Sequence, residues 1–276
     1  MLVATGLALV AAVLHASWNI AVKQKGDRFL ALWGLYVSAG VIATTTLTVW
    51  SLVDGTPSIA WLWSSISGCI HLPYVLLLAR AYEKNDFSVT YPIARGSGAL
   101  SAAIFGLLIL NDDLSALSMA GIAIVIFGLW FLATSQPITN LSPALGVGLT
   151  IGIYSVIDAY GARNSNAIAF AFSTFVSGAV AITAWALFTR ARELRPFWVA
   201  SWKSSVSGGL MSFVSYSLVV YAFSLAPVGF VATLRELSVV IAALAGWKYL
   251  KEDDHRRRLA CATIVVVGLI VLIAGR

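Results

Sequence analysis

The sequence has few charged residues. Only 11% of its 276 residues are charged, whereas soluble domains carry about 25%. The hydrophobic share is 59% and the mean hydropathy is +0.88. A chain so poor in charge lacks the polar residues of a soluble surface. We therefore expect an all-α or all-β integral membrane protein, with its charges gathered in loops.

Residues that build metal, redox or phosphate sites are also scarce. Cys69 and Cys261 both fall inside apolar runs, which favours packing over a disulfide or a metal site. His15, His71 and His255 lack metal-ligand spacing. No glycine-rich loop precedes a Lys-Ser or Lys-Thr pair. We expect no metal, no cofactor, no ATP engine and no enzyme, so an ion or substrate gradient would have to supply energy.

Apolar runs of about 20 residues recur along the chain, long enough to cross a bilayer. The alternation of period two that marks a membrane β-barrel is absent, which favours a helical bundle. The net charge of +6 fits basic cytoplasmic loops rather than a nucleic-acid partner. The predicted spans are 3–22, 29–50, 60–80, 87–110, 116–134, 142–161, 167–189, 205–224, 228–250 and 258–274.

The two halves of the chain resemble each other at a constant offset of 140 residues. Identical residues at this offset include the pairs Arg95/Arg235, Gly106/Gly246, Gly128/Gly268 and Asp113/Asp253. The pattern predicts two repeats, residues 1–136 and 137–276, of five helices each. Because five is odd, the second repeat would enter the membrane inverted. An inverted repeat places a binding site at mid-depth between the halves.

Two arginines fall inside apolar spans. Arg95 follows Tyr91 and Pro92, and Pro92 is expected to loosen its helix. Arg235 is followed directly by Glu236. An arginine at the bilayer centre costs roughly 2.5–3.5 kcal/mol on insertion scales, and it cannot lose its charge. Each arginine therefore needs a counter-charge or a water-filled cavity.

Several stretches of the sequence resemble one transporter family. They are Leu14-His-Ala-Ser-Trp-Asn19, Ala79-Arg-Ala-Tyr-Glu-Lys-Asn-Asp-Phe-Ser-Val-Thr-Tyr-Pro-Ile-Ala-Arg-Gly96, Tyr154-Ser-Val-Ile-Asp-Ala-Tyr160 and Ala226-Pro-Val-Gly-Phe-Val-Ala-Thr-Leu-Arg-Glu-Leu-Ser238. In order and spacing, the chain resembles the EamA-type ten-helix transporters of the drug/metabolite transporter superfamily. One departure is Asn111-Asp112 where the family has Gly-Glu, although Lys251-Glu252 keeps part of that pattern.

The resemblance implies two bundled five-helix halves, alternating access, and export or exchange of small metabolites such as amino acids. We expect a multi-pass protein of a bacterial cytoplasmic membrane. Its expected partners are the lipid bilayer and a small-molecule substrate, with protons as a candidate coupling ion. Neither the substrate nor the oligomeric state follows from the resemblance.

Polar side chains on shared helix faces are the candidate site residues. His15, Trp18 and Asn19 are spaced i, i+3, i+4, and His71 shares a face with Tyr74. Such faces are too polar to contact lipid, so we expect them to face the interior of the helical bundle. They either bind substrate or hold the bundle together through interhelical hydrogen bonds.

The charged residues within the spans carry the sharper hypotheses. Arg95 and Arg235, related by the repeat, are expected to face one cavity and bind a carboxylate or phosphate, with Tyr91 nearby. Alternatively Glu236 or Asp158 neutralises one arginine, and we favour a pairing that substrate or proton disturbs.

The sixth span carries two further candidates. Tyr154 and Asp158 share a face, and Asp158 either pairs with Arg163 or serves as a proton- or amine-binding carboxylate. We expect spans one, three, four, six, eight and nine to line the cavity, and spans five and ten to lie outside it.

Three functions remain open at this point. The first is a secondary transporter of a small polar metabolite, such as an amino acid or organic anion. The second is a flippase or exchanger for a sugar- or nucleotide-linked anion, which paired arginines would suit. The third is a membrane enzyme acting on lipid, which the two-fold repeat disfavours.

The distribution of basic residues predicts the orientation. The loops after odd-numbered spans hold 14 lysines and arginines, whereas even-numbered loops and the termini hold 2. The positive-inside rule therefore puts both termini outside the cytoplasm, although resemblance to ten-helix relatives implies that they are inside. We expect a phosphatase fused after Arg276 to be active and a fluorescent protein fused there to be dark. The reverse result would refute the orientation.

Overall fold

The computed structural model describes the chain apart from residues 24–25, 85–86, 134–140 and 242–254. The described part is all-α, with about 90% of the residues in helices and no strand. Its helices are α1 (Leu2–Lys23), α2 (Arg28–Val53), α3 (Trp61–Lys84), α4 (Phe87–Ile109), α5 (Ala116–Ala133), α6 (Ser142–Asn164), α7 (Ala167–Leu225), α8 (Val228–Leu234) and α10 (His255–Ala274).

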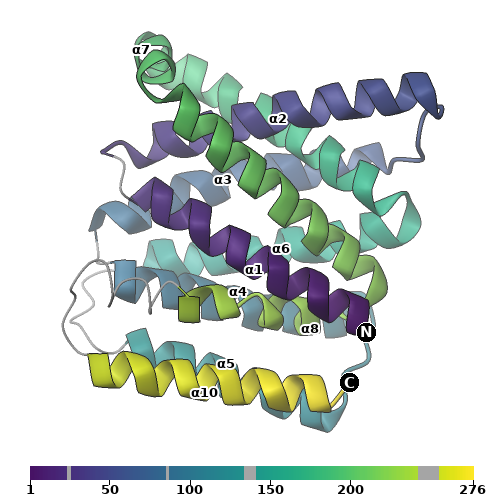
Figure 1. Ribbon diagram of the computed structural model, residues 1–276, viewed down its shortest axis with the longest axis vertical. Coiled ribbons are helices and arrows are strands. Elements are labelled where there is room, and N and C mark those ends of the chain that lie inside the picture. The colour runs from purple at the N-terminus through teal and green to yellow at the C-terminus, as the bar shows by residue number, and fades with distance from the viewer. Residues whose placement is uncertain (24–25, 85–86, 134–140, 242–254) are drawn as a thin grey trace.

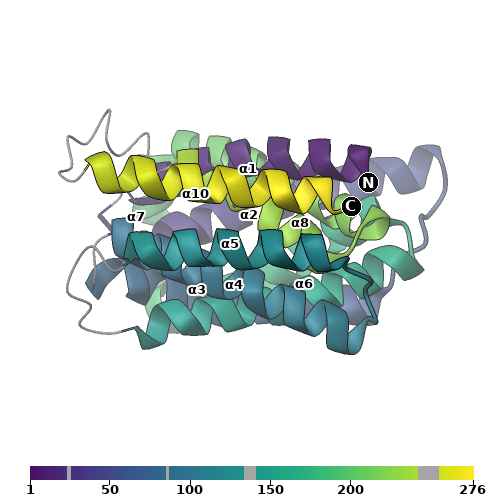
Figure 2. The ribbon, with the colours of Figure 1, turned by 90° about the horizontal axis from the view of Figure 1, so that it is seen from below.

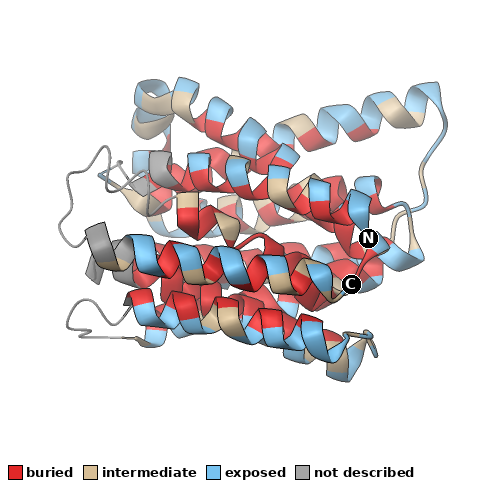
Figure 3. Ribbon diagram, turned by 60° about the horizontal axis from the view of Figure 1, so that its bottom comes forward, coloured by how far each residue is buried: buried red, intermediate tan, exposed pale blue. Residues whose placement is uncertain are grey.

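The helices are arranged as a membrane protein requires. Six described helices are long and apolar enough to cross a membrane, and α5 and α10 contain shorter apolar stretches. Large apolar side chains such as Leu108, Phe188 and Ile270 lie on the outer surface. Figure 3 shows this mixture of exposed outer and buried inner helix faces. The chain is a multi-pass helical membrane protein, because only lipid accepts such a surface.

The helix α7 differs from its sequence prediction. It contains the predicted spans 167–189 and 205–224, but only Arg190 departs from helical geometry, with φ −142° and ψ 29°. There the helix folds back on itself (Figure 1), so that two long arms lie side by side. The predicted loop Arg190–Lys203 is therefore wrong beyond its first residue. Its charged residues favour a loop between two spans, yet Arg, Glu and Leu are good helix formers.

The sharp bend at Arg190 is held from α2. The Arg190 guanidinium forms an ion pair with Asp27, with 2.6 Å between Nη2 and Oδ2. Asp27 also caps α2 by accepting a hydrogen bond from the Leu30 N–H at 2.9 Å. Partial burial by itself raises the pKa of Asp27, but these two donors bring the pKa below its ordinary value.

The predicted ninth span is interrupted. The helix α8 ends at Leu234, Arg235 and Glu236 form a turn, and helical geometry resumes at Leu237. Bonds of the i to i−3 type run through the turn, from Glu236 N to Thr233 O at 3.0 Å and from Ser238 N to Arg235 O at 3.0 Å. Pro92, by contrast, lies within a continuous α4. The helix α4 thus continues through Pro92, and the turn that interrupts a predicted span falls in the second half.

The edges of the bundle are formed by different helix pairs. The helices α5 and α10 lie together at one edge, α2 and α7 lie at the other, and the remaining helices fill the space between (Figures 1 and 2). A Cβ on Gly121 would lie 2.4 Å from the Leu272 backbone nitrogen, so only glycine allows α5 and α10 to approach this closely. Both chain termini lie at the same end of the bundle.

Two contacts join the predicted halves away from the bundle centre. The Ser101 hydroxyl of α4 donates to the Gly148 carbonyl of α6 at 2.9 Å. Arg163 pairs with Asp112 at 2.7 Å, and the other Asp112 oxygen accepts from the Val228 N–H at 2.6 Å. Arg163 also donates to the carbonyls that end α7. A count of ten spans stays a prediction, because much of the ninth lies outside the described residues.

Candidate functional site

A buried ion pair joins α4 to the turn after α8. Nη2 of Arg95 lies 2.7 Å from Oε1 of Glu236, and their side chains are 6% and 1% exposed. One turn earlier on α4, the Tyr91 hydroxyl donates to Ser238 at 3.1 Å. The Glu236 side chain reaches Arg95 from the turn that follows α8. Of the two expected partners for an arginine, the structure thus selects Glu236.

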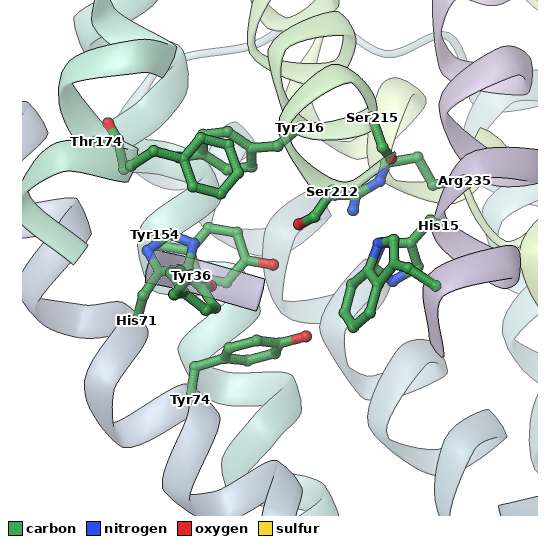
Figure 4. A pocket seen from close by; sticks show the side chains of 12 residues that line it. His15, Tyr36, His71, Tyr74, Tyr154, Thr174, Ser212, Ser215, Tyr216 and Arg235 are labelled. Atoms are coloured by element: carbon green, nitrogen blue, oxygen red, sulfur yellow. The ribbon is translucent and has the colours of Figure 1, made fainter. Parts of the chain in front are cut away.

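A pocket lies beside this pair. Its walls come from both predicted halves of the chain. The first half contributes α1, α2 and α3, and the second contributes α6, both arms of α7 and the turn after α8. The lining residues are His15, Trp18, Tyr36, His71, Tyr74, Tyr154, Thr174, Phe175, Ser212, Ser215, Tyr216 and Arg235. Figure 4 shows the lining side chains around the cavity.

Aromatic rings form one wall of the cavity. His71 stacks on Tyr154 with ring centroids 4.5 Å apart and an interplanar angle of 26°. Tyr74 and Tyr216 meet His71 edge-on, at 6.0 Å and 5.6 Å. The His71 ring is anchored by its Nδ1–H, which donates to the Ser67 carbonyl at 2.8 Å. This wall is therefore preorganised by its own contacts.

Asp158 lies behind the aromatic wall. It is fully buried, and it accepts hydrogen bonds from Ser67 at 2.5 Å and from Tyr216 at 2.7 Å. The alternative of an Asp158–Arg163 pair is wrong, because Arg163 pairs with Asp112. Tyr216 both contacts Asp158 and lines the cavity, so it connects the carboxyl group to the space where a substrate would lie.

Arg235 is the charged group on the cavity. Its residue is 4% exposed, and it forms no ion pair with any described residue. Its Nε and the Trp18 Nε1 are buried donors without a hydrogen-bond partner. His15 packs edge-on against Trp18 at 4.8 Å, and it lies near Arg235 in Figure 4. This side of the cavity offers hydrogen-bond donors and positive charge.

The structure divides the predicted site residues into two groups. His15, Trp18, His71, Tyr74, Tyr154 and Arg235 line the cavity, whereas Asn19, Tyr91, Arg95, Asp158 and Glu236 are buried around it. The sequence predicts that Arg95 and Arg235 both line the cavity. This is wrong for Arg95, which forms an ion pair with Glu236 instead. Asn19 instead donates to the His15 carbonyl and accepts from Tyr82.

The helices that line the cavity also differ in part from expectation. Of the described residues of α4, α5 and α10, none lines it, which confirms the placement of spans five and ten outside. The expected lining by span four is wrong, and α2 and the first arm of α7 take part instead. Ser212, Ser215 and Tyr216 were missed, although their i, i+3, i+4 spacing is the signal that singled out His15, Trp18 and Asn19.

Metal binding has no support in the described part of the chain. No three histidine, cysteine, aspartate or glutamate side chains gather there as a metal ion would require. What the described cavity combines is one unpaired guanidinium, several hydroxyl groups and aromatic walls. A guanidinium and hydroxyl groups are the kinds of group that hold an anionic part of a small molecule.

Comparisons with known proteins agree with this picture. The sequence profile of the EamA-like transporter family, which belongs to the drug/metabolite transporter superfamily, matches residues 141–274. No curated protein sequence matches the chain. A solved crystal structure of another protein aligns over 99% of this chain and 97% of its own, with a TM-score of 0.74 and 14% identity. At that identity the likeness shows the fold alone.

The ion pair at the centre of the site generates a stability prediction. Arg95→Ala leaves the Glu236 carboxylate buried without its cation, which typically costs about 3–5 kcal/mol. We expect a clear drop in the thermal midpoint of the detergent-solubilised protein, followed by size-exclusion chromatography. Arg95→Met combined with Glu236→Met should recover most of the loss, and exposed Arg192→Ala is the control. A double variant as unstable as Arg95→Ala would contradict the pairing.

Proposed function

We propose that this chain, which through its second half belongs to the EamA-like transporter family of the drug/metabolite transporter superfamily, is a secondary active transporter. It exports or exchanges a small polar metabolite, an amino acid or an organic anion, by alternating access. Family membership supports a membrane transporter of this superfamily. The finer parts of the proposal rest on the cavity and its charges.

We further propose an architecture of ten transmembrane helices in two inverted five-helix repeats, residues 1–136 and 137–276. Three observations support it: the offset of 140 residues in the sequence, a cavity walled by both halves, and a chain whose two termini lie at one end of the bundle. In such a repeat, substrate binds between the halves, and their relative rocking exposes it to either side. We place the protein in a bacterial cytoplasmic membrane with its basic loops inside.

The observation that carries the transport proposal is the unpaired Arg235 guanidinium on a cavity between the two halves. A buried cation is costly in a membrane protein, and it is retained where it serves a substrate or ion pathway. Arg95 carries the same charge but has Glu236 as a partner. Arg95 is thus held in an ion pair, whereas Arg235 forms no ion pair with a described residue and lines the cavity, where it can hold an anionic group of the substrate.

The two alternative functions receive less support from the site. A flippase or exchanger for sugar- or nucleotide-linked anions was suggested by two arginines acting together, and only Arg235 lines the cavity. A lipid-modifying enzyme would need a reactive group beside a base near one leaflet. His71 and Asp158 are both engaged with Ser67 within the bundle, through its carbonyl and its hydroxyl respectively.

Proton coupling, if present, would use Asp158 rather than Glu236. Asp158 contacts two hydroxyl groups and no described cation, so gaining or losing a proton breaks no ion pair. Protonation of Glu236 would remove the negative charge that pairs with Arg95. The hydroxyl of Tyr216 reaches from Asp158 toward the cavity, so substrate binding and the charge of Asp158 are linked through one side chain.

The transport proposal is tested in proteoliposomes with a panel of labelled compounds, namely benzoate, malate, phenylalanine and glucose 6-phosphate. We expect uptake of at least one of them above that of empty liposomes. Arg235→Gln should abolish this uptake, and Arg235→Lys should restore little, because an ammonium lacks the planar fork. The control Arg192→Gln changes an exposed arginine on α7. Unchanged transport by Arg235→Gln would exclude the proposed binding site.

The coupling proposal is tested by the pH dependence of the same uptake. We expect the initial rate of the wild-type protein to differ between acidic and alkaline buffers, because protonation of Asp158 changes the charge beside the cavity. Asp158→Asn should give rates that no longer vary with pH. Asp54→Asn, which changes an exposed carboxylate at the end of α2, serves as the matched control. An Asp158→Asn variant with the wild-type pH profile would eliminate this residue as the proton site.

A further inference from the structure

The charges around the cavity limit the charge of its occupant. Among the described residues that line it, Arg235 is the one with a permanent charge. The second guanidinium, Arg95, is 2.7 Å from the Glu236 carboxylate and does not line the space. One unpaired cation requires one negative charge for compensation. A dianion such as a phosphate monoester would carry a second charge into the bundle without a partner.

Two buried donors show which atoms the occupant presents. The Trp18 Nε1–H and the Arg235 Nε–H have no hydrogen-bond acceptor, and their residues are each 4% exposed. An indole N–H and a guanidinium can only donate. A buried donor left unpaired costs about 1–3 kcal/mol, so an acceptor in the cavity would relieve both groups. A carboxylate brings two acceptor oxygens and the single negative charge.

The opposite wall indicates the shape of the rest of the molecule. Figure 4 shows Tyr36, Tyr74, Tyr154 and His71 grouped on one side of the view, with Arg235 and His15 on the other. These rings offer flat faces and edges, which attract another flat ring by offset or edge-on packing.

The same lining argues against a zwitterion. Among the described lining residues there is no carboxylate to receive an ammonium group. The nearby Asp158 is fully buried and engaged by Ser67 and Tyr216. The positive charge of Arg235 also opposes a second cation in the same cavity.

From these observations we infer that the substrate is an aromatic monocarboxylate, with its carboxylate on Arg235 and Trp18 and its ring against the tyrosine wall. This inference rests on the proposed transport function and deepens it. It narrows the substrate from small polar metabolites in general to molecules with a single negative charge, a carboxylate as the acceptor group and a flat aromatic ring. It also makes Trp18 a specificity-determining residue through its indole N–H.

Calorimetric binding to the purified, detergent-solubilised full chain tests the inference with matched probes. Benzoate carries all the required features, and each other probe changes one of them. Cyclohexanecarboxylate lacks the flat ring, benzamide lacks the charge, phenylalanine adds an ammonium group, and phenyl phosphate adds a second negative charge. We expect benzoate to bind most tightly, with cyclohexanecarboxylate weaker by up to roughly tenfold and benzamide not binding.

Matched variants test the role of Trp18. Trp18→Phe keeps an aromatic ring but removes the N–H, and it should weaken benzoate binding by roughly fivefold to tenfold. Trp33→Phe removes an equally buried, unpartnered indole N–H that packs on Phe197 and Trp198 away from the cavity, and it should leave binding unchanged. Equal losses in both variants would refute the assignment of Trp18.

The outcomes separate the substrate class from the transport function. Tighter binding of phenylalanine or phenyl phosphate than of benzoate, lost in Arg235→Gln, would overturn the aromatic monocarboxylate and leave Arg235 as the transport site. Benzoate binding that survives Arg235→Gln would overturn both. Failure of all five probes to bind would overturn the substrate class, while uptake of malate or glucose 6-phosphate by proteoliposomes would still uphold transport.

Discussion

The ion pair between Arg95 and Glu236 is the interaction on which the rest of the site depends. It joins a helix of the first half to the interrupted span of the second half at a depth where neither charge tolerates isolation. Glu236 lies in the hydrogen-bonded turn that follows α8. Because Arg95 is paired with Glu236, Arg235 is the group that gives the cavity its charge.

The two arginines show how a repeat is adapted for function. Arg95 and Arg235 occupy equivalent positions, separated by 140 residues. Arg95 lies in a continuous helix despite Pro92, whereas Arg235 lies in a turn with tight i to i−3 bonds. Arg235 lines the cavity, and the adjacent Glu236 pairs with Arg95 of α4. The position equivalent to Glu236 in the first half is Gly96, so the asymmetry of the site is present in the sequence of the two halves.

Local sequence signals located most helix ends well, but they predicted a loop within α7 where the chain is helical. The boundaries of α1 and α6 lie within three residues of their predicted ends, because apolar length and flanking turn residues act locally. The segment after Arg190 is helical even though it is charged. It packs on α2 through Phe197 and Trp198, which contact Trp33. The i, i+3, i+4 pattern of Ser212, Ser215 and Tyr216 was present but was not recognised, because serine is common in membrane helices.

By itself, the sequence determined the class of protein, the approximate helices, the internal repeat and the short set of polar residues from which the site is built. Composition and periodicity decide these features, because lipid accepts only apolar, hydrogen-bonded helices. Only the tertiary structure decided which arginine is neutralised and which one faces the cavity, and that Asp158 contacts hydroxyl groups instead of Arg163. Such pairings depend on helix rotation and on one interrupted turn, and neither is encoded by the spacing of residues along a single helix.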